Sequence, residues 1–290
     1  MSGAFFVRSF LACAIAALGI WLAPSPGAAQ VATPSPSAAP SPAVASSPTP
    51  AEVEGSDVNP LGLVRAWSLV GLYTGSSYAP GDLRATQIVL REAVARLGQS
   101  LLRATLPTMI DVQNGASGFG DAQVFYFFES PVRNGRFGIG PSISVPTASN
   151  AALGSGKWSI GPAAGYLVAA KKARIVSGFL MQSFFSVAGP SWRKPQSLVY
   201  FQPLLVHDLG AGWSLRSVDA TWAFDMQRGS SIMPLSLGVG KMIHAGGQTF
   251  VVALSDIATV VHANAPRAPK NAVKLNISIV YPKAFPQPRS

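Results

Sequence analysis

Most of the chain is built from segments of about ten residues in which apolar side chains alternate with small or polar ones. The clearest lies near the C-terminus: every second residue from Val273 to Tyr281 is Val, Leu, Ile or Tyr, and Lys274, Asn276 and Ser278 lie between them. A period of two places the two kinds of side chain on opposite faces of a β-strand. Strands of this kind are typical of a membrane β-barrel, which turns one face to lipid and the other to its lumen.

The same alternation recurs at residues 102–107, 121–128 and 233–240. We therefore expect an all-β protein, an antiparallel up-and-down transmembrane β-barrel of about 12 strands, within bounds of about 10 and 14. The predicted strands are centred near Val70, Val89, Thr105, Val124, Ser142, Ala163, Leu180, Phe201, Val218, Leu237, Val252 and Ile277.

Turn-forming residues between these segments predict connections that alternate in length. Short turns are expected at residues 96–98, 133–135, 171–172, 209–211 and 245–247. Longer loops are expected at residues 76–80, 113–117, 147–156, 189–196, 226–230 and 263–270. Outer-membrane barrels have short periplasmic turns and longer extracellular loops, and an even strand count places both ends of the barrel on the periplasmic side.

Composition favours the membrane interpretation. Hydrophobic residues make up 48% of the chain and charged residues 12%, about half the charged share of a soluble domain. Only one stretch, near the N-terminus, is long and apolar enough to cross a bilayer as a helix, which excludes a protein of several membrane helices. A soluble β-sandwich would explain strands that are apolar on both faces, such as Ile175 to Phe185, but the low charge content argues against it.

The regions that flank the predicted barrel have compositions of their own. Residues 1–29 combine the positive Arg8, an apolar core and small residues at the end, which is the pattern of a cleaved signal peptide. Residues 30–58 are rich in Pro, Ala and Ser and predict a disordered linker. The barrel is expected over residues 59–283, followed by a C-terminal tail at residues 284–290.

The charge balance is basic, with 22 Lys and Arg against 12 Asp and Glu. The positive residues are scattered along the chain rather than gathered on one helix face, so nucleic acid is not an expected partner. The expected partners are outer-membrane lipids and lipopolysaccharide, the barrel-assembly machinery and a small-molecule solute.

Catalytic and metal sites are not predicted, and no cofactor is expected. The three histidines are far apart in the sequence, without the spacing of paired metal ligands. His207 and Asp208 are the best candidates for a hydrolase site, but no serine nucleophile motif accompanies them. The protein is therefore not expected to be an enzyme.

Polar residues on the predicted inner face define a candidate solute path. They are Arg103, Asp121, Gln123, Gln202 and Asp219. Inside a barrel, such side chains either line a water-filled path that selects solutes by charge or pair across the lumen and close it, because unpaired buried charges are costly. Twelve strands do not decide between these, since barrels of about eight strands are filled by side chains and those of roughly sixteen hold a channel.

The predicted loop at residues 147–156 is the candidate gate of this path. The candidate gate residues in and beside it are Thr147, Gly154, Gly156, Lys157 and Trp158.

The Gly- and Pro-rich segment at residues 137–147 and the Leu-Gly-Ser-Gly-Lys-Trp run at residues 153–158 resemble a known family. It is the group of bacterial outer-membrane barrels named for a MetA-pathway of phenol degradation, often described as transporters. Residues 118–121 and 234–239 fit the same pattern, so the resemblance covers residues 59–283. It implies an outer-membrane location and passage of small solutes, aromatic or hydrophobic ones among them, and it carries over no catalytic residue.

The sequence thus predicts an exported barrel that passes small solutes across the bacterial outer membrane. A closed barrel with a structural or envelope-interaction role is the first alternative, and an outer-membrane hydrolase that modifies lipids is the second.

Overall fold

The computed structural model describes residues 65–78, 85–97, 100–112, 117–266 and 268–281, which all belong to one compact unit. The signal peptide predicted at residues 1–29, the linker at 30–58 and the tail at 284–290 lie outside the described residues. The elements are β1 (Arg65–Ser77), β2 (Ala85–Leu97), β3 (Ser100–Val112), β4 (Gly118–Phe119), β5 (Ala122–Val132), β6 (Gly135–Val145), β7 (Trp158–Ala170), the 3-10 turn η1 (Lys171–Ala173), β8 (Ile175–Ala188), β9 (Ser197–Gly210), β10 (Trp213–Ser217), β11 (Trp222–Asp225), β12 (Ser230–Ala245), β13 (Gln248–Ala263) and β14 (Pro269–Tyr281).

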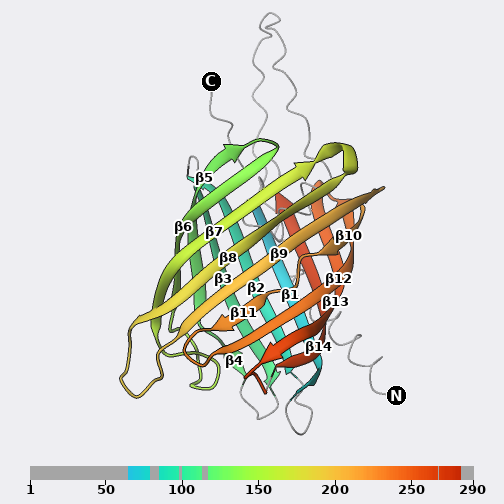
Figure 1. The fold of residues 1–290 in the computed structure, drawn as a ribbon. Coiled ribbons are helices and arrows are strands. Elements are labelled where there is room, and N and C mark those ends of the chain that lie inside the picture. Colours follow the sequence, from blue (N-terminus) through green and yellow to red (C-terminus); the bar gives the residue numbers. More distant parts are fainter. Residues whose placement is uncertain (1–64, 79–84, 98–99, 113–116, 267, 282–290) are drawn as a thin grey trace, which may run out of the picture. The chain divides into compact units, whose positions relative to one another are not determined.

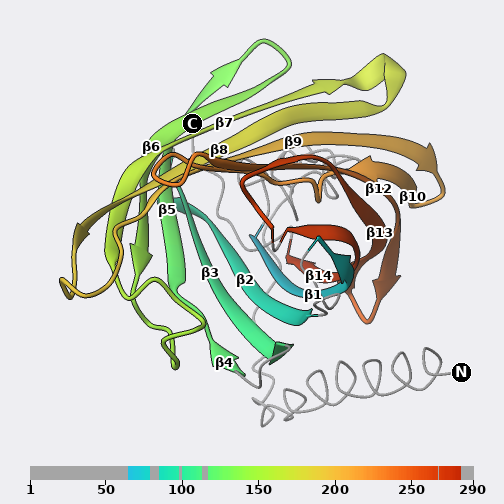
Figure 2. The ribbon, with the colours of Figure 1, turned by 60° about the horizontal axis from the view of Figure 1, so that its bottom comes forward.

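These strands form one antiparallel sheet that closes on itself (Figures 1 and 2). Successive strands pair along the wall, and the ring closes where β12 pairs with β13, β13 with β14, and β14 with β1. β4 and β5 both pair with β3 and together fill a single strand position in the wall. β10 and β11 likewise both pair with β9 and β12 and fill a single strand position between them. The strands of the described residues therefore occupy twelve places around the wall, and the predicted up-and-down barrel is confirmed.

Connections alternate in length between the two ends of the barrel. At one end, β12 and β13 are joined by Gly246 (φ 58°) and Gly247 (φ 75°), and two consecutive left-handed residues are what a type I′ hairpin turn requires. At the other end, residues 146–157 and 189–196 form long connections. The first residue of β1 and the last of β14 both lie at the short-turn end, as an even number of places requires.

The outer face of the wall is apolar. Along β12, Leu235, Leu237 and Val239 are exposed, whereas Ser236 and Gly238 between them are buried. An apolar band of this kind suits contact with lipid chains and would be unusual on a soluble protein of this size. No helix among the described residues is long and apolar enough to span a membrane.

The inner face is partly apolar, which explains why residues 175–185 show no clean alternation. Val176 of β8 packs inside the barrel with Leu204, Val206 and Val218. Leu180, also of β8, belongs to a second internal cluster with aromatic residues of β5. This strand therefore has apolar side chains on the outer face of the wall and in the internal hydrophobic clusters.

Asp256 interrupts the apolar outer face. It is exposed at the middle of β13, on the face opposite the buried Ser255 and in register with Leu237 and Val273, which are both exposed. Carboxylates on the lipid face of a barrel are destabilising, by less than the roughly 2–4 kcal/mol of a basic residue at the midplane.

We expect Asp256→Leu to stabilise the barrel by about 1 kcal/mol, because it removes a charged group from the apolar outer band. The measurement is the midpoint of urea unfolding in lipid vesicles. Leu254→Asp, on the same face of the same strand, is the matched control and should lower the midpoint. A lower midpoint for Asp256→Leu would contradict the placement of this face against lipid.

Candidate solute path through the barrel

A cavity of about 790 Å³ lies at the long-loop end of the barrel. Its rim is formed by Ala152 to Ser155 of the β6–β7 loop and by Trp192, Arg193 and Lys194 of the β8–β9 loop. Its floor is formed by inward-facing residues of the wall, among them Gln123 and Tyr200. We call this space the mouth cavity.

A second, smaller cavity of about 170 Å³ lies deeper in the lumen. Arg103, Phe125 and Gln202 line this inner cavity, and Thr105, Gln123 and Tyr200 line both cavities. The shared lining residues make the two spaces neighbours inside the barrel.

The barrel wall is interrupted beside the inner cavity. Ser217 ends β10 opposite Leu205 of β9, and Trp222 begins β11 opposite Phe201. Residues 218–221, between β10 and β11, are therefore four residues opposite the three residues 202–204 of β9. One extra residue on one of two paired strands is typical of a β-bulge. The bulge, residues 218–221, turns inward: Val218, Asp219 and Ala220 are all buried.

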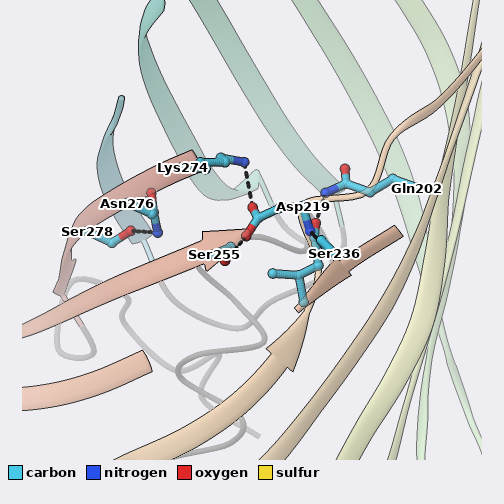
Figure 3. Close-up of polar contacts among 8 residues, drawn as sticks. Gln202, Asp219, Ser236, Ser255, Lys274, Asn276 and Ser278 are labelled. Carbon is cyan, nitrogen blue, oxygen red and sulfur yellow. Dashed lines mark hydrogen bonds and ion pairs between the residues drawn. The ribbon is translucent and has the colours of Figure 1, made fainter. Parts of the chain in front are cut away.

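Asp219 is held inside the barrel by three neighbouring strands (Figure 3). Its carboxylate lies 2.5 Å from the Lys274 ammonium and accepts a hydrogen bond of 2.5 Å from the Ser255 hydroxyl. Its backbone N–H donates to the Ser236 hydroxyl oxygen at 3.2 Å. The side chains of Asp219 and Lys274 are 3% and 12% exposed. The sequence named Asp219 as a lumen residue, but its partners come from strands 17 to 55 residues away along the chain.

Arg103, Gln123 and Gln202, three of the predicted lumen residues, line the inner cavity. Arg103 is buried, and its guanidinium lies 5.6 Å from the centre of the Phe125 ring. The Gln202 side-chain amide donates to the carbonyl of Val218, which fixes it against the bulge. Tyr200 and Phe125 also line this cavity, and the sequence does not mark them, because a buried aromatic side chain carries no signal that separates a cavity wall from a packed core.

Asp121 also lines the mouth cavity, and its carboxylate accepts hydrogen bonds from the candidate gate loop. One carboxylate oxygen accepts the Ala148 N–H at 3.2 Å, and the other accepts the Ser155 N–H at 2.6 Å and the Ser155 hydroxyl at 2.7 Å. A Cβ at Gly154 would come within 2.4 Å of Asp121 Oδ1, so the loop closes tightly around this carboxylate.

Other gate candidates fasten the same loop. The Thr147 hydroxyl accepts the Ala122 N–H and donates to the Gly120 carbonyl. Lys157 is buried, and its ammonium donates to the carbonyl of Pro190 at 2.6 Å, which ties this loop to the β8–β9 loop.

The remaining two gate candidates differ from each other in position. Gly156 has a left-handed backbone (φ 68°) beside the Arg193 side chain at the rim. Trp158 is exposed at the start of β7, on the face opposite the buried Ser159, so it points away from the lumen.

The candidate hydrolase pair is separated by the barrel wall. His207 is exposed on β9, whereas the neighbouring Asp208 is buried and pairs with Arg174 at 2.9 Å. Adjacent residues of a strand point to opposite faces, so these two side chains do not share one site. Among the described residues, no group of three or more His, Cys, Asp or Glu side chains is arranged to hold a metal ion.

A closed antiparallel sheet with an apolar outer face and cavities in its interior defines a β-barrel of the transmembrane type. The chain is similar to an outer membrane channel from Pseudomonas putida F1, with 15% identity and a TM-score of 0.58 over 78% of this chain and 98% of that one. It is also similar to the NanC porin, with 10% identity and a TM-score of 0.49 over 74% and 98% of the two chains. The likeness to the channel shows the fold. No family model and no curated protein match the sequence, so the resemblance to the phenol-degradation family stays a prediction.

Proposed function

We propose that this protein is a channel of the bacterial outer membrane that passes small solutes. The observation that carries the proposal is that the mouth cavity and the inner cavity lie next to each other inside the barrel and share the lining residues Thr105, Gln123 and Tyr200. The apolar outer band and the short-turn and long-loop ends support an orientation with the mouth cavity on the outside of the cell.

The size and lining of the path favour small solutes of mixed character. The inner cavity is about 170 Å³, and its lining combines the amides of Gln123, Gln182 and Gln202 with the apolar Phe125 and Leu180. A wide aqueous pore would have a wholly polar lining, whereas this one offers contacts for both polar and apolar parts of a solute.

The experiment is conductance of the purified full-length protein in planar lipid bilayers. The gel mobilities of unheated and heated samples in detergent are compared first. A difference between the two mobilities establishes that the barrel is folded and resists the detergent until it is heated. We then expect discrete conductance steps. A folded barrel without conductance would overturn the channel proposal in favour of a closed barrel with a structural role, for which the Asp219 contacts across the bulge are the supporting observation.

Gln123→Trp tests the path itself, because it places a large side chain where the two cavities meet. We expect it to lower the conductance sharply. Ile143→Trp is the matched control: Ile143 lies on the neighbouring strand β6, is 37% exposed and faces outward, so its replacement should leave conductance unchanged. Equal conductance in the two variants would place the conducting path elsewhere.

A further inference from the structure

We propose that the mouth cavity is an entry subsite for small organic anions, whose anionic group binds to Arg193 and Lys194 of the β8–β9 loop. The exposed Trp192 beside them would contact the apolar part of the solute. This inference rests on the proposed channel function and specifies the charge of the solutes that enter the same path.

Basic side chains outnumber acidic ones in the lining of the mouth cavity. The described lining includes Arg193, Lys194 and Arg228, and Asp121 is its one described carboxylate. Arg228 is matched by Asp225, which lies 2.5 Å away. No carboxylate of the described residues pairs with Arg193 or Lys194. The lining therefore carries an excess of positive charge, which attracts anions and repels cations.

The carboxylate of Asp121 is hydrogen-bonded to the protein. One oxygen accepts the Ala148 N–H, and the other accepts both the N–H and the hydroxyl of Ser155. A carboxylate has about four lone-pair sites, and three of those on Asp121 are occupied by donors of the β6–β7 loop. It therefore offers little to a cation in the cavity, and the preference set by the rim is for anions.

Arg193 is fixed at the rim before a solute arrives. Its guanidinium donates to the carbonyl of Ala151 at 2.8 Å and lies 4.8 Å from the centre of the Trp192 ring. Its side chain also lies close to Gly156, where an added Cβ would be 3.0 Å from Nε. The hydrogen bond uses one of the five N–H donors of a guanidinium, so donors remain for an anion. A cation already held in place loses less entropy on binding.

Lys194 supplies the second positive charge of the rim. It is exposed, and its side chain makes no hydrogen bond, ion pair or ring contact with the described residues. Its replacement therefore changes the charge of the rim without removing a contact that holds the loop. This makes Lys194 the sharpest position at which to test the proposal.

The cavity also offers apolar area for the body of an organic anion. Trp192 is 73% exposed at the rim, and Phe184 and Tyr200 belong to the lining further in. A space of roughly 150 Å³ holds one benzene ring, so the mouth cavity of about 790 Å³ admits an organic anion together with water. Aromatic side chains contribute large apolar contact areas to such sites.

The first measurement is the ion selectivity of single channels in planar bilayers of uncharged lipid at pH 7. Across a KCl gradient near 0.1 M, we expect Cl− to be at least about threefold more permeant than K+, and this ratio should fall at about 1 M KCl, where charges are screened. Lys194→Gln should lower the ratio, and Lys194→Glu should lower it further. Lys172→Gln is the matched control, because Lys172 is exposed in the turn η1 at the opposite end of the barrel, and it should leave the ratio unchanged.

The second measurement is block of the current by three probes of similar shape: phenylacetate, phenylacetamide and phenethylammonium. We expect phenylacetate to block at least about tenfold more strongly than phenylacetamide, because hydrogen bonds between charged groups are stronger than those of neutral groups. Phenethylammonium should block least. The double variant Arg193→Gln, Lys194→Gln should remove the preference for phenylacetate, and Trp192→Ala should weaken block by phenylacetate and phenylacetamide alike.

Channels that conduct but are blocked equally by phenylacetate and phenylacetamide would overturn this inference and leave the channel function intact. A selectivity that Lys194→Gln and Lys194→Glu leave unchanged would do the same. If the double variant does not fold, the Lys194 variants and the three probes on the unaltered protein decide. Absence of conductance would overturn the channel function. Calorimetry with the folded barrel would then decide the subsite, and equal binding of phenylacetate and phenylacetamide, or binding of neither, would overturn it.

Discussion

Replacing Asp219 by asparagine is expected to lower the free energy of unfolding of the barrel by about 3–5 kcal/mol. Asparagine keeps the shape of the side chain and can still accept the Ser255 hydrogen bond. It removes the carboxylate that now lies 2.5 Å from the Lys274 ammonium, whose side chain is only 12% exposed. Loss of one partner of a buried ion pair is costly because the other charge stays removed from water. Urea unfolding in lipid vesicles, followed by tryptophan fluorescence, measures the change.

Asp208→Asn is the matched control for this prediction. Asp208 is also buried and paired, but its partner Arg174 is about half exposed, so water replaces the lost carboxylate. We expect a loss of about 1 kcal/mol or less there. The double variant Asp219→Asn, Lys274→Gln should recover much of the loss seen with Asp219→Asn alone. Equal losses for Asp219→Asn and Asp208→Asn would show that the internal pair does not hold the bulge.

Asp121→Ala is expected to release the loop over the mouth cavity. It removes three hydrogen bonds that reach the loop at Ala148 and Ser155. Hydrogen bonds to charged groups are worth about 1.5–3 kcal/mol each, so the opening equilibrium of the loop should rise by about 100-fold or more. Hydrogen–deuterium exchange of residues 148–155 measures this change, and a larger single-channel conductance would show that the loop gates the path.

Asn150→Ala serves as the control within the same loop. Its side chain accepts one hydrogen bond from the Ala152 N–H, and this bond joins two residues of the loop rather than the loop and the barrel wall. We expect exchange to change only locally and conductance to stay the same. If Asp121→Ala and Asn150→Ala accelerate exchange equally, Asp121 is not the anchor of the loop.

Much of the fold could be predicted from local patterns. Alternation in β12 and β14 gave the correct inner and outer faces: Leu235 and Val273 are exposed, and Asn276 and Ser278 are buried. Eleven of the twelve expected strand centres lie within strands. The exception is Val218, which lies in the bulge. A single extra residue changes neither composition nor period enough to be visible in the sequence.

The candidate site was predictable only in part. Arg103, Gln123 and Gln202 were expected inside because each is a polar residue on the inner side of an alternating strand, and each lines the inner cavity. Asp121 follows the same pattern, yet it anchors a loop. Its role depends on residues 27 and 34 positions later in the chain.

The sequence by itself determined the period of two, the apolar outer face and the places of the turns, because each depends on residues within one strand or one turn. The tertiary structure alone decided which inner side chains meet. Closure of the sheet brings Asp219 to Lys274 and Arg103 to the cavity beside Tyr200. These contacts depend on strand register and on one inward bulge, and both are set by packing across the whole barrel rather than by neighbouring residues in the chain.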